Sequence, residues 1–124
     1  MRDSKRAFNW ITNLLDEMGH PYVVVGGLAA NVFGGKRQLN DIDLDVPKIA
    51  LLEVAEQAKS YVTFGPAQYR DEQFDIELLS LRYAEQDIDL TAAENIMLFD
   101  RQAAEWREVP TDLRAGERHE VLGK

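Results

Sequence analysis

The chain has 124 residues, of which 45% are hydrophobic and 29% charged, and its formal net charge is -8. This length and composition fit one soluble domain with an ordinary core. The acidic balance argues against a domain that grips nucleic acid by charge, because such domains carry a basic excess. The absence of cysteine excludes disulfides, thiolate zinc sites and cysteine nucleophiles.

The N-terminal segment lacks the apolar core of a signal peptide, and no apolar run approaches the roughly 20 residues that a membrane-spanning helix needs. We therefore expect a cytoplasmic protein that makes no membrane contact. We expect residues 1–124 to form a single domain, in which the charged tail from about 111 to 124 is partly mobile.

The first part of the chain alternates between helix and strand patterns. Residues 4–19 are predicted to form an amphipathic helix with Ser4 as its N-cap. The β-branched run that ends at residue 25 predicts a buried strand. A short helix is expected at about 28–33, between two glycine pairs.

The strand pattern resumes at residues 40–46, and Pro47 opens a second long helix that runs to about residue 60. The remaining pattern favours strands over helices. This order predicts an α+β fold, a mixed β-sheet with helices packed mainly on one face. The expected later strands are 61–65, 67–70 and 73–81, followed by a hairpin between 93–100 and 105–109.

The strand at 40–46 carries the most unusual pattern, because Asp41, Asp43 and Asp45 alternate with apolar residues. Side chains at i and i+2 share a face of a strand, so three carboxylates lie together. Like charges repel and aspartate has a low strand propensity, so this row is poor design for a plain surface strand. Carboxylates gathered near a strand end are suited to holding Mg²⁺, which prefers oxygen ligands.

The segment at 73–81 offers further carboxylates, because Asp75 and Glu77 share one of its faces. If this strand lies beside residues 40–46, one of the two completes the acidic cluster. That residue then serves as a metal ligand, as a general base, or as both. The alternative is an ordinary strand whose acidic face is solvated.

Two other sites with similar patterns are excluded by spacing. A calcium loop of the EF-hand type that starts at Asp41 needs glycine and glutamate where Val46 and Leu52 stand. A phosphate loop that ends at Lys36 needs serine or threonine where Arg37 stands.

Together, the strand before Gly26-Gly27, the short helix and the Asp41-x-Asp43 pair resemble the signature of the DNA polymerase β-type nucleotidyltransferase superfamily. The nearest group is that of small bacterial proteins similar to lincosamide and aminoglycoside nucleotidyltransferases. The resemblance covers residues 22–46 and extends to the segment around Glu77.

The resemblance implies roles for particular residues. Gly26 and Gly27 match the turn that binds the nucleotide phosphates, and a helix N-terminus is suited to that task. Asp41 and Asp43 match the metal ligands, and Glu77 matches the third carboxylate, with Asp75 as the second choice. Lys36 and Arg37 lie where basic residues contact the triphosphate, or else are solvated loop cations.

The implied activity is transfer of a nucleoside monophosphate from a nucleoside triphosphate to a hydroxyl acceptor, a small molecule or a protein, with two Mg²⁺ ions. Relatives continue with a helical part that helps to bind the acceptor. We therefore expect a homodimer or a partner chain to supply that part. The alternative is a non-catalytic nucleotide-binding or protein-interaction module of the same fold, for instance in a toxin–antitoxin pair.

Overall fold

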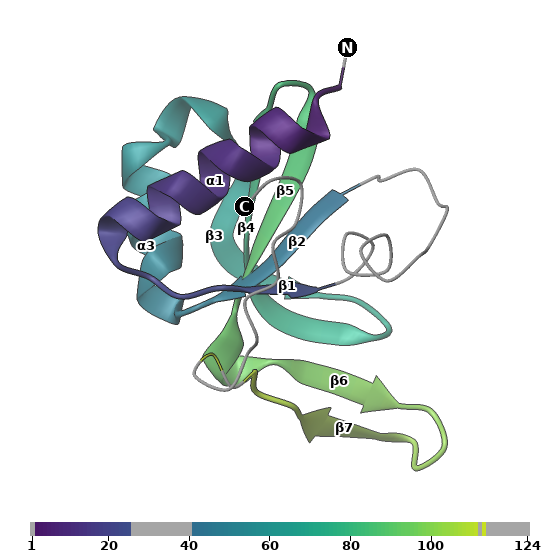
Figure 1. The fold of residues 1–124 in the computed structure, drawn as a ribbon. Helices are drawn as coiled ribbons and strands as arrows, with labels where there is room; N and C mark the ends of the chain where they lie inside the picture. Colours follow the sequence, from purple (N-terminus) through teal and green to yellow (C-terminus); the bar gives the residue numbers. More distant parts are fainter. Residues whose placement is uncertain (1, 26–40, 112, 114–124) are drawn as a thin grey trace.

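Two helices and seven strands make up the part of the chain that the computed structural model describes, which is residues 2–25, 41–111 and 113 (Figure 1). The helices are α1 (Ser4–Met18) and α3 (Lys48–Gln57). The strands and the 3-10 turns η1 and η2 are β1 (Val23–Val25), β2 (Asp41–Val46), η1 (Lys59–Tyr61), β3 (Val62–Arg70), β4 (Phe74–Tyr83), β5 (Gln86–Ala92), η2 (Ala93–Asn95), β6 (Met97–Asp100) and β7 (Glu105–Glu108).

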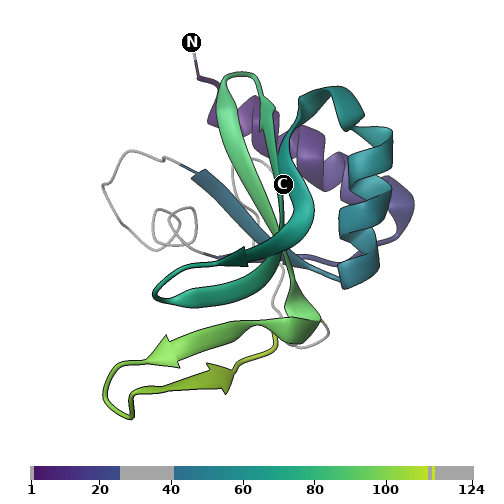
Figure 2. The same ribbon diagram turned by 180° about the vertical axis from the view of Figure 1, so that it is seen from behind.

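All seven strands belong to one mixed sheet, in which β1, β2, β5 and β4 follow one another in that order. Only β2 and β5 run parallel, and the other pairs are antiparallel. β3 pairs with one edge of β4, whereas β5 and then β6 pair with its other edge. The β3–β4 and β6–β7 hairpins project to the same side of the molecule (Figure 2), where the Arg70 guanidinium lies 5.0 Å from the centre of the Trp106 ring.

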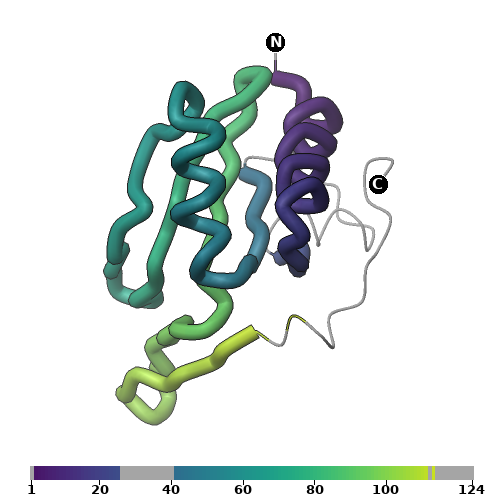
Figure 3. The backbone as a smooth tube through the Cα atoms, turned by 90° about the vertical axis from the view of Figure 1, so that its left-hand side faces the viewer, coloured from purple at the N-terminus to yellow at the C-terminus, as the bar shows by residue number. Residues whose placement is uncertain are grey.

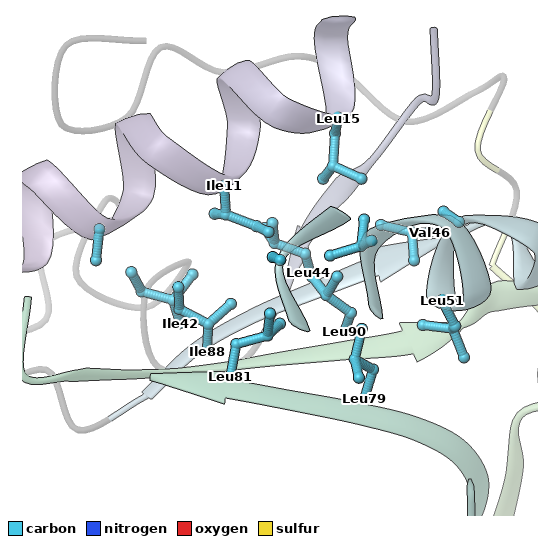
Figure 4. Packing of buried hydrophobic residues seen from close by; sticks show 14 of the residues in the cluster. Ile11, Leu15, Ile42, Leu44, Val46, Leu51, Leu79, Leu81, Ile88 and Leu90 are labelled. Carbon is cyan, nitrogen blue, oxygen red and sulfur yellow. The ribbon is translucent and has the colours of Figure 1, made fainter. Parts of the chain in front are cut away.

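Both helices lie against the same face of the sheet (Figure 3), as the sequence predicts. The core forms between them and the central strands. Its members are apolar side chains with almost no exposure, and Figure 4 shows how they interdigitate. They include Phe8, Ile11 and Leu15 of α1, Leu51 and Val54 of α3, Ile42, Leu44 and Val46 of β2, Leu79 and Leu81 of β4, and Ile88 and Leu90 of β5.

The ends of α1 depart slightly from the expectation. Asp3, not Ser4, is the N-cap, and its carboxylate accepts a hydrogen bond of 3.0 Å from the backbone N–H of Arg6. The hydroxyl of Ser4 instead donates to Gln86 on the neighbouring hairpin, at 2.7 Å. Gly19 ends the helix because its φ of 77° is a left-handed conformation that glycine adopts without strain.

Most strand expectations are confirmed, including β2, β4 and the β6–β7 hairpin. The two strands expected at 61–65 and 67–70 form the single irregular strand β3. The condition under which Asp75 or Glu77 would complete the acidic cluster, that β4 lies beside β2, is not met, because β5 lies between them. The sequence interpretation did not recognise β5, since the two-residue turn that separates it from β4 is Ala84-Glu85, with positive φ angles but without the glycine or asparagine that marks such turns.

Two expectations fall outside the described residues: the short helix at about 28–33 and most of the tail from 111 to 124. Among the residues that the structure does describe, no helix has the length and apolar character to cross a membrane.

We predict that Leu44→Ala lowers the free energy of unfolding by about 2–5 kcal/mol, because a fully buried leucine leaves a cavity between β2 and the helices. Urea denaturation measures this loss. Leu52→Ala is the matched control, since Leu52 is 60% exposed on α3, and it should change stability by no more than about 0.5 kcal/mol. Equal losses in the two variants would contradict the packing.

Candidate active site

A row of four residues crosses the face of the sheet opposite the helices. Val25 of β1 pairs with Asp43 of β2. Asp43 in turn pairs with Asp89 of β5, and Asp89 pairs with Ser80 of β4. Adjacent strands lie about 4.8 Å apart, so the two carboxylates are held next to each other by the backbone pairing.

The environment of this pair disfavours two negative charges. Burial, followed by the charges of Asp89, Asp41 and Asp45, raises the pKa of Asp43 from its ordinary 3.8 to about 6. Burial also raises the pKa of Asp89. A hydrogen bond of 2.6 Å that the hydroxyl of Ser80 donates to the Asp89 carboxylate partly offsets this rise. The pair therefore concentrates negative potential that a cation would relieve.

Asp41 extends the acidic row toward the start of β2, where it is exposed and pairs in register with Asp87. The charge of Asp87 also contributes to the raised pKa of Asp89, although the carboxylate of Asp87 lies 3.2 Å from the guanidinium of Arg82. Asp41 is near enough to raise the pKa of both Asp43 and Asp89, so the three carboxylates share one local field.

Asp45 has a different role from its neighbours. It is buried, and it accepts a hydrogen bond of 2.5 Å from the hydroxyl of Thr111, beyond the last strand. The backbone N–H of Thr111 also bonds to the carbonyl of Ala93, at 3.0 Å. Asp45 thus anchors the segment after β7 to the sheet, which accounts for the third aspartate of the row.

The structure does not bring Glu77 or Asp75 to this row. Glu77 alternates with the residues of β4 that face Asp89, and its carboxylate lies 3.0 Å from the ammonium of Lys48 on α3. Asp75 accepts a hydrogen bond of 2.6 Å from the side chain of Gln68 on β3. The side chain that lies beside Asp43 belongs instead to Asp89.

The other candidates, Gly26, Gly27, Lys36 and Arg37, lie outside the described residues. Val25, which immediately precedes the two glycines in sequence, pairs with Asp43 at the edge of the sheet. The chain therefore enters the predicted glycine turn from a position next to the carboxylates.

A cavity of about 710 Å³ opens on the same face. Asp43, Asp45 and Asp89 lie at one part of its lining, whereas apolar residues of β4 and β6 make up much of the rest. A volume of this size accommodates a nucleotide-sized ligand.

A metal ion would find a partial ligand set here. Across residues 2–25 and 41–111, no three acidic or histidine side chains converge as a complete metal cage. Mg²⁺, however, uses one or two carboxylates and takes its other ligands from water and substrate phosphates. The Asp43–Asp89 pair, with its raised pKa values, fits an ion of that kind.

The sequence contains a signal for Asp89 that the first interpretation missed. The tetrapeptide Asp-Ile-Asp-Leu occurs twice, at 41–44 and again at 87–90. In the structure the two copies lie side by side in parallel register, position for position. The repeated tetrapeptide marks Asp89 as a candidate of the same kind as Asp43, whereas the pairing of the two strands is known only from the structure.

Comparisons with known proteins bear on the fold. No protein-family model matches the chain, and no curated protein matches it in sequence. The structure is similar to the crystal structure of a "putative nucleotidyltransferase" from Thermotoga maritima, with a TM-score of 0.65 and 16% sequence identity. The match covers 92% of this chain and 70% of that one.

The chain has a nucleotidyltransferase-like fold. The expected α+β architecture is thereby confirmed, with its mixed sheet and its helices on one face. A likeness at 16% identity establishes the fold alone, and it does not extend to the lincosamide and aminoglycoside enzymes in particular.

The pKa of Asp43 leads to a prediction about stability in the absence of divalent cations. A folded-state pKa above the ordinary value means that the stability from this group is present below about pH 4 and is lost as the pH rises through about 6. Asp43→Asn should therefore be more stable than the wild type at pH 8, by about 1–2 kcal/mol after allowance for solvent screening. Urea denaturation in a chelator measures this gain.

The gain should shrink at pH 5, where most of the wild-type Asp43 is protonated. Glu56→Gln is the control, because Glu56 is exposed on α3, away from the acidic row, and its replacement should change stability by no more than about 0.5 kcal/mol at either pH. Equal stability of the wild type and Asp43→Asn at pH 8 would contradict the crowded arrangement of the carboxylates.

Proposed function

We propose that the protein is a Mg²⁺-dependent nucleotidyltransferase that moves a nucleoside monophosphate from a nucleoside triphosphate to a hydroxyl group of a small molecule or protein. The observation that carries this proposal is the in-register pairing of Asp43 with Asp89, next to the strand that leads into Gly26-Gly27. The nucleotidyltransferase-like fold supports it.

In this proposal Asp43 and Asp89 would hold Mg²⁺ as a pair, and Asp41, which is exposed at the start of β2 and acts on both carboxylates through its charge, would be a further ligand where the second of two expected ions binds. Bound Mg²⁺ supplies charge stabilisation for the entering and leaving oxygens of the phosphoryl group. Gly26 and Gly27 provide backbone N–H groups to the triphosphate, and Lys36 and Arg37 add positive charge. Two adjacent carboxylates of raised pKa are an unfavourable arrangement by themselves, and cation binding offsets that cost.

A side chain of this protein can also accept the proton that the acceptor hydroxyl loses. When the acceptor oxygen bonds to the α-phosphorus, the bond to pyrophosphate breaks and the hydroxyl proton must leave. Asp89 is suited to accept it, because its carboxylate lines the cavity and is fixed by a hydrogen bond of 2.6 Å from the hydroxyl of Ser80 on β4. Ser80 then acts as a positioning residue for this carboxylate.

Glu77 is assigned no part in the reaction, contrary to the sequence interpretation. Its carboxylate is engaged with Lys48 on the side of the sheet that the helices cover. Glu77 and Lys48 are better understood as a link between β4 and α3.

We predict that calorimetry detects binding of a nucleoside triphosphate only when Mg²⁺ is present. Asp43→Asn and Asp89→Asn should each weaken this binding by at least about tenfold, since each removes a ligand charge from the metal. Glu77→Gln is the matched control on a neighbouring strand, and it should bind as the wild type does.

Weak binding in Glu77→Gln together with normal binding in Asp89→Asn would contradict the role of Asp89. It would instead support Glu77 as the third carboxylate of the site, as the resemblance implies. Binding without any release of pyrophosphate, across acceptors and with the full chain, would favour a non-catalytic nucleotide-binding module. A homodimer or partner chain that completes the acceptor site remains part of the proposal, and size-exclusion chromatography with and without nucleotide tests the homodimer.

A further inference from the structure

The cavity next to the Asp43–Asp89 pair continues well beyond the two carboxylates. On β4, the residues that follow Ser80 on the same face are Leu78 and Ile76, and both line the cavity. Ile96 and Leu98, from the segment that pairs next along the edge of β4, line it as well. The cavity therefore has an acidic end and a long apolar floor.

This floor is not covered by the described part of the protein. Ile76, Leu78 and Leu98 are only partly buried, in contrast to their fully buried neighbours Leu79 and Leu81 on the other face. Phe74 and Val109 at the margin are 39% and 41% exposed. Partly exposed apolar side chains that line a concave surface are typical of sites that take a small ligand.

The polar groups of the lining set the charge of that ligand. None of the described residues that line the cavity is lysine, arginine or histidine. Asp71 stands at the far margin, where hydrogen bonds from the backbone N–H groups of Gln73 and Phe74, and to a lesser degree from the hydroxyl of Tyr69, lower the pKa of its carboxyl group. The cavity is thus acidic at both ends, and it disfavours an anionic ligand that, unlike the triphosphate, brings no Mg²⁺ with it.

The order of the strands indicates which of the two substrates, the nucleoside triphosphate or the acceptor, lies on this apolar floor. An in-line displacement needs the entering oxygen and the departing pyrophosphate on opposite sides of the phosphorus. β1, which ends at Val25 immediately before the two glycines in the sequence, lies on one side of the Asp43–Asp89 pair. The apolar floor begins at β4, on the other side of the same pair.

We propose that the apolar floor binds the acceptor, and that the acceptor is a neutral or cationic molecule whose hydroxyl is attached to an aromatic or apolar body. This inference rests on the proposed nucleotidyl transfer and specifies its second substrate. The body lies on Ile76, Leu78 and Leu98, and the hydroxyl reaches Asp89. The new bond joins that oxygen to the α-phosphorus, pyrophosphate leaves, and Asp89 receives the proton.

Three phenols of similar shape test this assignment: tyramine is cationic, 4-ethylphenol is neutral and 4-hydroxyphenylacetate is anionic. They are titrated into the methyl-labelled full chain with Mg²⁺ and a non-hydrolysable nucleoside triphosphate, and the resonances of the floor are followed by NMR. Tyramine and 4-ethylphenol should shift the methyl groups of Ile76 and Leu98 saturably. The anionic phenol should bind at least about tenfold more weakly.

Ile76→Ser should weaken the binding of tyramine at least about fivefold, because it removes apolar contact area from the floor. Ile49→Ser is the matched control, since Ile49 is 52% exposed on α3 and lines no part of this cavity. Val109→Ser provides a second change in the cavity, at a 41% exposed position where folding is not at risk. It should also weaken binding while the control does not.

The outcomes separate this inference from the proposal on which it rests. If the triphosphate binds with Mg²⁺ but no phenol does, the acceptor assignment is overturned and the proposed transferase activity stands. Equal binding of all three phenols overturns it too, as does displacement of the phenols by the nucleoside moiety alone. Phenol binding without any triphosphate binding removes the proposed function, and with it the description of this floor as an acceptor site.

Discussion

The parallel pairing of β2 with β5 is the contact on which the rest of the structure depends. Each strand carries the sequence Asp-Ile-Asp-Leu, and the two copies lie in register. The isoleucines and leucines therefore stack on one face, where the helices bury them. Because side chains alternate along a strand, the same register brings Asp43 and Asp89 together on the other face. A slip of one residue would place the aspartates in the core, so the hydrophobic face specifies the acidic one.

This arrangement separates the source of stability from the place of chemistry. The apolar side chains of both copies, together with α1 and α3, supply burial energy that exceeds the repulsion between nearby carboxylates. The repulsion remains as raised pKa values at Asp43 and Asp89. A site held by a rigid, buried strand pair keeps its geometry better than one built from loops. The cost of the crowded charges is small compared with the energy of the core that maintains them.

The strands on the two sides of the Asp43–Asp89 pair contribute different parts of the proposed site. β1, which ends at Val25 immediately before Gly26-Gly27 in the sequence, lies on one side of the carboxylates, while β4 and β6 provide an apolar surface on the other. Asp45 and Thr111 connect the end of the described chain to β2, and Arg70 packs against Trp106 between the two hairpins. Neither contact places a basic residue of the described chain in the lining of the cavity.

Local pattern was sufficient for several conclusions, because they depend on periodicity and turn residues alone. The helices, the strand at 40–46, the strand at 73–81 and the last hairpin could all be predicted from the amino-acid sequence. So could the gathering of Asp41 and Asp43 on one face, and the α+β class.

The tertiary structure decided which strand lies beside β2. Asp75 and Glu77 had the right chemistry and alternation, but β5 occupies the neighbouring position, and Lys48 engages Glu77 from the helix side. Strand order depends on long-range pairing, which a local pattern does not specify. Only that pairing made Asp89 the partner of Asp43.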